Sequence, residues 1–477
     1  MKARIFADEN RKWWTLGALA FALFMIMLDN TVVNVALPSI QRDLGIGLSQ
    51  LEWTVNAYAL TFAVFMLTGG KLADFFGRKR IFLLGLVLFT LSSLLCGLAS
   101  SGEMLIGART AQGVGAALML PATLSIISAT FPPELRGMAI GIWAGVSAMA
   151  LAIGPLIGGL ITEHIDWSWI FIVNVPIGVL GLAVGWFVIR ESRDTSADQR
   201  LDFPGLITSG VGLFALTFAL IEANSYGWTD PVIIGLFALS AVALVAFVLL
   251  EMHQRSPMLD LSLFRSSTFA GSNVVALLVT LSMFGVFFFM SIYMQNILGY
   301  SATKTGAAFL PMTLLIILIA PIAGRSSDRI GSRALMTAGM LCLTASLVIF
   351  SRLGLDSTFW DILPGLIVGG FGMGLVMTPM TAAALGSVPV EKSGVGSGVL
   401  NTFRQVGGAL GIAVMGAIVA SYVDLGAGRP NPADFIDGFQ VALRVAAVFA
   451  LIGAVVAVTT IRKHRHMDAS ELAEAAA

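Results

Sequence analysis

Several ionisable side chains lie inside long apolar stretches of the sequence, where a charge is costly and is usually kept for function. The clearest are Asp29, Arg109 and Arg404. A carboxylate in such a place can bind and release a proton, and a guanidinium beside it can balance the charge. These residue types predict reversible proton binding inside a membrane.

Asp29 and Arg109 are expected at similar depth. Asp29 lies eight residues before Leu37, and Arg109 lies six after Glu103. At the helical rise they fall about 12 Å and about 9 Å below the same surface. Comparable depth lets them share a site that titrates as water access changes. The alternative is a fixed buried pair that only braces two helices. Gln112 shares the helix face of Arg109.

The sequence offers little for enzymatic chemistry. Cys96 and Cys342 lie inside apolar stretches, which gives neither a disulfide framework nor metal-ligand spacing. The four histidines lie at the ends of such stretches or in the C-terminal tail. No phosphate-binding P-loop occurs. We therefore expect no enzyme, no metal site and no cofactor.

The composition is that of a membrane protein. Hydrophobic residues make up 57% of the chain and charged residues 12%, with a mean hydropathy of +0.88, whereas soluble chains carry about 25% charged residues. A membrane-spanning helix needs about 20 apolar residues. Fourteen such stretches occur, at 13–37, 51–70, 80–99, 103–130, 136–162, 168–189, 204–224, 231–252, 268–298, 303–323, 333–353, 358–386, 393–422 and 435–461.

The distribution of basic residues orients these stretches. The 28 Lys and Arg residues balance 28 Asp and Glu residues, so no net positive field exists to hold nucleic acid. An even number of spans places both termini on one side, and most of the bases fall on that side. The exceptions are Arg42, Lys304, Arg352 and Arg429 on the other side and Arg109, Arg404 and Arg444 within spans. The bias predicts that both termini are cytoplasmic.

An internal repeat divides the chain. Gly70, Asp74 and Gly77 recur at one constant spacing around Asp328, and glycines of the fifth stretch recur in the thirteenth. Parallel six-helix repeats form a transporter architecture with a substrate site between the halves. We expect a six-helix bundle over residues 1–190, an inserted helix pair with its linkers over 191–265, a second six-helix bundle over 266–462, and a cytoplasmic tail over 463–477.

Four motifs resemble those of the major facilitator superfamily, in particular its fourteen-span drug/proton antiporter branch (the EmrB/QacA type). They lie at residues 28–38, 70–80, 109–115 and 154–159. The resemblance covers the whole chain and implies an all-α polytopic membrane protein with the major facilitator fold, built of two six-helix bundles plus two inserted helices. It implies export of lipophilic drugs or toxic compounds, with cations as the expected class, by proton-coupled alternating access.

The resemblance also implies roles for residues. The first and fourth helices of the family line its central cavity, so Asp29 and Arg109 are expected to couple protons to substrate. Acids similar to Glu222 occur in the branch, so Glu222 is a further candidate for proton coupling, and a solvated helix end is the alternative. Flexible methionines and aromatic rings suit lipophilic cations, although both commonly pack against neighbours or lipid. The expected cavity residues are Asn30, Asn34, Trp53, Tyr58, Gln112, Met373, Met377, Arg404 and Gln405.

The loop from Gly70 to Arg80 is expected to act as a gate. In the family, Asp74 accepts hydrogen bonds from the start of the helix that begins here near Ser393, since a helix N-terminus favours an anion. That contact would close the cytoplasmic side, with Arg78 pairing to an acid such as Glu134. The alternative is that the bases only set topology and bind anionic lipid. The proposed gating residues are Gly70, Asp74, Gly77, Arg78 and Arg80.

The fifth stretch carries a Gly-Pro motif. Pro155 removes a backbone hydrogen bond at mid-span, and Gly154, Gly158 and Gly159 allow close helix contact. In the family this motif marks exporters, so we expect a hinge between the halves. The alternative is that Gly and Pro are simply common in membrane helices.

Two other functions fit the same sequence features. One is an exporter of a dedicated metabolite or lipid, and the other is a membrane sensor that binds a ligand without transporting it. The expected location is the cytoplasmic (inner) membrane of a bacterium. The expected partners are a small lipophilic substrate, protons and membrane lipids, and a monomer is sufficient because the chain holds both halves.

Overall fold

The computed structural model describes residues 8–193, 202–254, 257–388, 392–423 and 431–462. Within these ranges the chain forms helices and connections, with no strand. The predicted tail over 463–477 lies outside the described residues. Thirteen helices in the described ranges are long and apolar enough to cross a membrane.

The helices of the N-terminal part follow the first six predicted stretches. They are α2 (Asp8–Leu44), α3 (Leu48–Phe76), α4 (Arg78–Gly97), α5 (Gly102–Thr130), α6 (Pro133–His164), α7 (Trp169–Ile172) and α8 (Asn174–Val188). α7 and α8 together form one span. α6 covers the fifth predicted stretch and is 32 residues long, but it includes side chains that the structure does not describe.

The rest of the chain follows the other eight stretches. Its helices are α9 (Phe203–Tyr226), α10 (Pro231–His253), η1 (Leu261–Arg265), α11 (Ser267–Ile292), η2 (Tyr293–Ile297), α12 (Ala302–Ala308), α13 (Leu310–Ile330), α14 (Ser332–Phe350), α15 (Phe359–Gly386), α16 (Ser393–Tyr422) and α17 (Pro432–Thr460). α11 continues into η2, and α12 into α13, so each pair makes one span.

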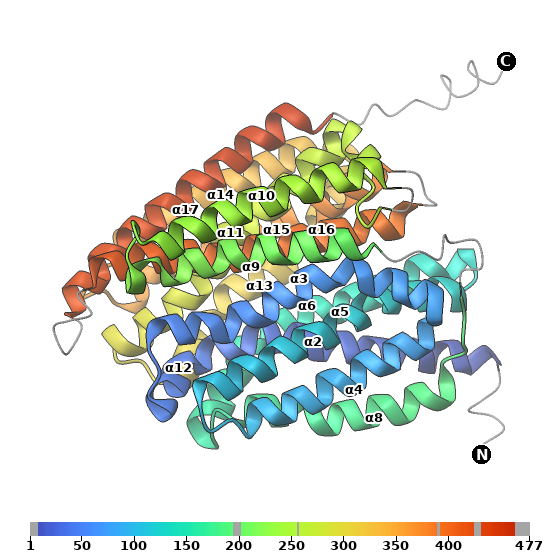
Figure 1. Cartoon of the computed structure of the whole chain (residues 1–477), viewed down its shortest axis with the longest axis horizontal. Helices are drawn as coiled ribbons and strands as arrows, with labels where there is room; N and C mark the ends of the chain where they lie inside the picture. Colours follow the sequence, from blue (N-terminus) through green and yellow to red (C-terminus); the bar gives the residue numbers. More distant parts are fainter. Residues whose placement is uncertain (1–7, 194–201, 255–256, 389–391, 424–430, 463–477) are drawn as a thin grey trace.

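Most helix packing falls within two groups. In the first, α5 packs against α3 and α4, and α2 packs against α6 and α8. In the second, α16 packs against α11, α15 packs against α13 and α14, and α17 packs against α11 and α14. The groups meet where α3 contacts α16, α6 contacts α12 and α13, and α2 contacts α11. α9 packs on α10 and also contacts both α3 and α16 (Figure 1).

The two ends of the bundle differ. We call the end where α2 begins and α17 ends the terminal face, and the end that holds α12 the distal face (Figure 1). At the distal face Gln295 Nε2 donates to the carbonyl of Val35 at 2.8 Å, and the Thr303 N–H donates to Glu163 Oε2 at 2.8 Å. Gly306 lies so close to the carbonyl of Pro155 that a Cβ would overlap it. These contacts close the distal face between the two groups.

The helices differ in how much of their surface is buried, as expected for a bundle in contact with lipid. The most apolar window of α10 has a mean hydropathy of 2.9 and is only 17% buried, whereas that of α11 is 83% buried. Side chains such as Leu91, Trp186 and Val242 are large, apolar and exposed. An exterior of this kind is solvated by lipid, so the chain is a multi-pass membrane protein.

The segment 257–265, which we call the connector, runs from α10 to α11 at the terminal face and joins several helices. Lys71 Nζ of α3 donates to the carbonyl of Pro257 at 2.7 Å. The Met258 N–H donates to Asp202 Oδ2 at the start of α9, at 3.1 Å. Asp260 pairs with Lys392, just before α16, at 2.7 Å. The connector thus touches the N-terminal group, α9 and the start of α16.

Candidate functional site

The structure brings together Asp29 of α2 and Arg109 of α5. Both side chains are 0% exposed. Arg109 Nη1 donates to Asp29 Oδ2, and Gln112 Nε2 donates to Asp29 Oδ1 at 3.0 Å. Arg109 Nη1 also donates to Gln112 Oε1 at 2.8 Å. Three residues singled out in the sequence therefore form one closed, buried network.

Arg109 is fixed from a third side by α3. Its Nε donates to the carbonyl of Thr54 at 3.0 Å, and its Cζ lies 4.3 Å from the centroid of the Tyr58 ring. α3 can approach this closely because Gly113 follows one turn along α5, where a Cβ would overlap Thr61 Oγ1 and the carbonyl of Tyr58. A single guanidinium thus ties together α2, α3 and α5, and its ring contact is of the cation–π kind.

The geometry suits a carboxylate whose charge is balanced. Both oxygens of Asp29 accept a hydrogen bond, and the charge-assisted pair offsets part of the cost of burial. Arg109 Nη2 is buried and has no hydrogen-bond partner in the described structure. The network therefore balances a charge on Asp29, and a proton on Asp29 would weaken its bond with Arg109 Nη1 and leave the bond of that atom to Gln112.

The structure places Glu222 and Trp53 away from this network. Glu222 of α9 accepts hydrogen bonds from the Ser49 hydroxyl and from Trp53 Nε1, both on α3. The Trp53 ring packs against Phe214 and Phe218 of α9, at centroid distances of 5.7 Å and 5.9 Å. Trp53 and Glu222 therefore form a contact between α3 and α9.

The remaining cavity candidates separate into two sets. On α2, Asn30 Nδ2 donates to the carbonyl of Ile26 at 3.0 Å, and Asn34 Nδ2 donates to that of Asn30 at 3.2 Å. Both amides thus bond to their own helix. In the C-terminal group, Arg404 Nη2 donates to Thr381 Oγ1 of α15 at 2.8 Å. Met373 and Met377 lie on α15, where Met373 is buried and Met377 is half-buried, and Gln405, which follows Arg404 on α16, is buried.

The predicted gate loop forms the tight junction between α3 and α4. Gly77 ends α3 and caps α4 with φ of +112°, and Gly331 occupies the equivalent place between α13 and α14 with φ of +89°. The repeated glycines thus serve a repeated turn. A Cβ at Gly70 would meet only Pro121, at an ordinary 3.5 Å.

The charged residues of this loop pair locally. Arg78 donates from Nε and Nη2 to Asp74 Oδ1, both at 3.0 Å, so the acid it contacts lies one turn earlier on the chain. Arg80 lies 3.8 Å from Glu191, which follows α8 and accepts a hydrogen bond from the Lys79 N–H. The Glu134 side chain lies outside those described.

The glycines of α6 are contact points. Gly154 lies against Thr31 and Gly158 against Val32, both of α2, where a Cβ at 158 would stand 2.7 Å from the Val32 carbonyl. Gly159 lies against Ala302 of α12, in the other group. Pro155 is buried beside Gly306. The motif therefore allows α6 to touch α2 on one side and the C-terminal group on the other.

Glu52 is a buried acid that the sequence did not single out. Glu52 of α3 is 2% exposed, and its Oε2 has no hydrogen-bond partner in the described structure. The sequence does contain a signal for it, because an acid inside the apolar stretch 51–70 meets the same criterion that selected Asp29. Its position one residue into that stretch made it resemble a solvated helix end.

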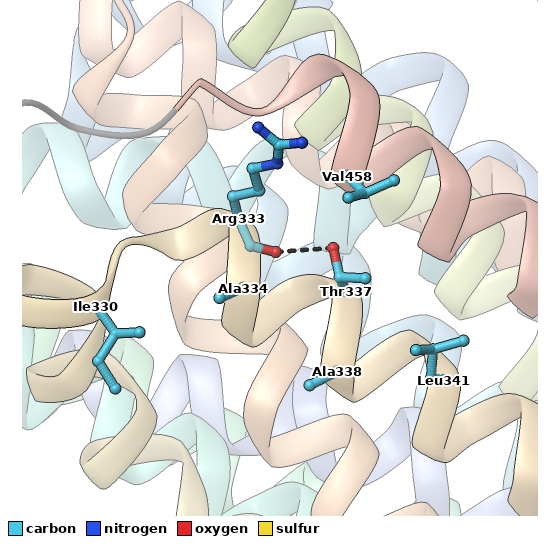
Figure 2. A pocket seen from close by; sticks show the side chains of 7 residues that line it. All are labelled: Ile330, Arg333, Ala334, Thr337, Ala338, Leu341 and Val458. Carbon is cyan, nitrogen blue, oxygen red and sulfur yellow. Dashed lines mark hydrogen bonds between the residues drawn. The ribbon is translucent and has the colours of Figure 1, made fainter.

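Figure 2 shows a groove elsewhere on the molecule, on the outside of the C-terminal group. It is lined mainly by one face of α14, from Arg333 to Leu341, with Ile330 of α13 and Val458 of α17. The Thr337 hydroxyl donates to the carbonyl of Arg333 at 2.8 Å. No residue of the Asp29 network lines it.

Comparison with known proteins identifies the family. The model described as Major Facilitator Superfamily matches residues 19–412 and 275–476. The chain is 39% identical over 453 residues to the puromycin resistance protein pur8 of Streptomyces alboniger, covering 93% of this chain and 89% of that protein. It is 38% identical over 412 residues to the multidrug resistance protein Stp of Mycobacterium tuberculosis, covering 86% and 76%.

A solved structure supports the fold. A bacterial homologue of the human lysosomal transporter Spinster, in an inward-facing and unoccupied conformation, aligns over 96% of this chain and 98% of that one. The TM-score is 0.66 at 17% identity. The matches to resistance proteins and to the family model place this chain among transporters rather than enzymes. The chain belongs to the Major Facilitator Superfamily.

Proposed function

We propose that this protein is a proton-coupled exporter that moves lipophilic, cationic drugs or toxic compounds out of the cell by alternating access. The observation that carries the proposal is the buried network of Asp29, Arg109 and Gln112. A carboxylate at this depth, balanced by a single guanidinium, has the composition of a reversible proton site. The resistance proteins among its relatives support export as the direction.

The steps follow from the hydrogen bonds of Asp29. With Asp29 ionised, Arg109 and Gln112 hold both of its oxygens, and the site is neutral overall. When water reaches the site and a proton binds to Asp29, the charge attraction to Arg109 is lost, and the tie between α2 and α5 is reduced to the Gln112 hydrogen bond. A cationic substrate can then compete with the proton for the carboxylate, so proton binding favours substrate release. Exchange of the two across the membrane is antiport.

The contacts between the two groups support a state closed at the distal face. Gln295 bonds to α2 there, and Thr303 bonds to Glu163. In our proposal the terminal face is cytoplasmic, in agreement with the basic residues, and the membrane is the bacterial cytoplasmic membrane. A substrate from the cell would enter at the terminal face before the distal contacts part.

We assign the chain to the fourteen-span branch, with α9 and α10 as the inserted pair between bundles over residues 1–190 and 266–462. Two observations support this assignment. α9 and α10 pack mainly on each other, and α6 fills the stretch that would complete fourteen spans. Because both halves lie in one chain, we propose a monomer as the working unit.

Transport by purified protein in lipid vesicles tests the proposal. An imposed pH gradient should drive accumulation of a fluorescent lipophilic cation by the wild type, and Asp29→Asn should abolish it while the protein still inserts. Asp43→Asn is a matched control on the same helix, because asparagine keeps an oxygen to accept the Trp167 indole N–H. Undiminished gradient-driven transport by Asp29→Asn would refute the assigned role.

The same vesicles separate the alternative functions. A sensor would bind the cation without moving it in any gradient. An exporter of a dedicated compound, which the name of the puromycin resistance relative favours, would transport one member of a panel of cationic, neutral and anionic compounds. A multidrug exporter would transport several of the cations.

A further inference from the structure

Glu52 is an unusual buried acid because it lies where three parts of the fold meet. It is on α3, and a Cβ at Gly416 of α16 would overlap its carboxyl group. One residue along, Trp53 Nε1 donates to Glu222 of α9 at 3.3 Å. Glu52 thus stands at the distal junction of the N-terminal group, the α9–α10 pair and the C-terminal group.

A second carboxylate lies close to it. Glu222 accepts hydrogen bonds from Ser49 and Trp53, which lie three residues before and one residue after Glu52 on α3. No ion pair of the described residues involves either acid. Glu222 has two donors, whereas Glu52 Oε2 has no hydrogen-bond partner.

The described contacts at this junction bring no cation to balance Glu52 and Glu222. α16 presents Gly416 and Ala417 to it, and the Ala417 carbonyl accepts a hydrogen bond from Asn224 of α9 at 2.7 Å. Glu103 at the start of α5 bonds to Gln50, on the exposed side of the same turn of α3. A buried carboxylate without a cation, beside another carboxylate, strongly disfavours its charged form.

We propose that Glu52 is a second proton-binding site, separate from Asp29, and that its proton holds α3, α9 and α16 together at the distal face. Loss of the proton leaves two carboxylates at one junction, and their repulsion and hydration separate α16 from α3. Its part in the transport cycle rests on the proposed function. Its effect on the distal contacts does not, because it follows from the packing alone.

The site is mechanically linked to the Asp29 network through α3. Thr54, whose carbonyl accepts the Arg109 Nε hydrogen bond, lies two residues beyond Glu52. Two residues turn a helix by roughly 200°, so Glu52 and Thr54 lie on opposite faces of α3. One face contacts the first proton site and the other contacts the distal junction.

Distances between spin labels test the proposal directly. Labels at Met104→Cys, at the start of α5, and Tyr422→Cys, at the end of α16, report the distal separation; both residues are exposed. Cys342 is replaced by alanine, and Cys96 is buried. In lipid nanodiscs without substrate, raising the pH from about 5 to about 9 should shift the wild type toward longer distances.

The variants then separate charge from packing. Glu52→Gln keeps the shape without the charge and should stay at the short distance throughout, whereas Glu52→Asp should regain the pH-dependent shift. Asn224→Leu removes the tie to α16 and should move the shift to lower pH, which supplies a test if Glu52→Gln fails to fold. A wild type that does not respond to pH, or a Glu52→Gln variant that follows it, would overturn the proposal.

Asp29→Asn distinguishes this inference from the proposed function. It should abolish gradient-driven transport and retain the pH-dependent distal shift. A shift that disappears with Asp29→Asn would assign the pH response to Asp29 and contradict a role for Glu52. Failed transport by the wild type with an intact distal shift would refute the transport function and leave the Glu52 site standing.

Discussion

Arg109 donates to the carboxylate of Asp29 and to the backbone carbonyl of Thr54, and so one buried side chain joins three helices of the N-terminal group. The two bonds are of different kinds. The first depends on the charge of Asp29, and the second does not. In our proposal, protonation of Asp29 therefore weakens the Arg109 bond to α2, where Gln112 still donates to Asp29, while the bond between α3 and α5 is unchanged.

We predict that removing Arg109 alone destabilises the protein more than removing Arg109 and Asp29 together. Arg109→Gln leaves Asp29 as a buried charge without its counterion and should destabilise the protein by about 3–5 kcal/mol. The double variant Asp29→Asn/Arg109→Gln should recover most of this loss, because no charge remains. Thermal unfolding in detergent measures both. Additive losses in the double variant would show that the two residues do not act as a pair.

We predict that Gly158→Leu blocks transport. The new side chain would overlap the backbone of α2 at Val32, and overpacking of this kind costs about 1–3 kcal/mol. Gly145→Leu is the matched control on α6, because a Cβ there meets nothing within 4 Å. Uptake into vesicles measures the effect. Equal loss in the two variants would argue against a specific contact between α6 and α2.

We predict unequal costs for alanine at the two repeated glycines. Both Gly77 and Gly331 have positive φ angles, so alanine at either should cost about 1–3 kcal/mol of strain. Alanine at 77 also displaces Glu191, whose carboxyl would lie 2.6 Å from the Cβ. Gly77→Ala should therefore be worse by about 1 kcal/mol in unfolding. In a Glu191→Ala background this difference should vanish, and its persistence would exclude Glu191 as the cause.

We predict that the Asp260–Lys392 pair matters little and loses its effect in acid. Burial raises the pKa of Asp260, but the hydrogen bonds from Lys392 and Ser262 outweigh it and leave the pKa below its usual value. The stabilisation is therefore complete above the unfolded pKa of about 3.9 and is lost as the pH falls through the lower folded value.

Exposure of the pair sets the size of that effect. Its side chains are 29% and 47% exposed, so Asp260→Asn should cost less than about 1 kcal/mol at pH 7, and still less in high salt. The wild type and the variant should converge in thermal unfolding once the pH lies below the lowered pKa of Asp260 in the folded protein. A difference that persists there would indicate a contact other than the ion pair.

Much of the fold follows from the sequence because every helix that crosses the lipid needs about 20 apolar residues. The stretch 80–99 and helix Arg78–Gly97 nearly coincide, since polar residues bound the span on both sides. Boundaries were less accurate where a helix continues past the membrane, as at Asp8. The break between α7 and α8 depends on local geometry that hydropathy does not record.

The candidate site, too, could be predicted from the sequence only in part. Depth along two helices was enough to pair Asp29 with Arg109, and helical spacing was enough to add Gln112. The sequence does not show how a helix is rotated about its own axis. Trp53 was therefore expected in the cavity with Tyr58, but the structure places it against α9. Glu52 was missed for a related reason, because burial near a helix end depends on the neighbour, here Gly416.

The connector has a consequence for protein engineering. A shortened twelve-span chain, made by joining residue 193 directly to residue 266, would delete more than a peripheral helix pair. It would remove one acceptor of the Lys71 ammonium group, the Pro257 carbonyl, and the Asp260 carboxylate that pairs with Lys392. Both lysines would lose these contacts at the same face. The insertion is therefore not a detachable module, and a minimal version would need to replace both of these contacts.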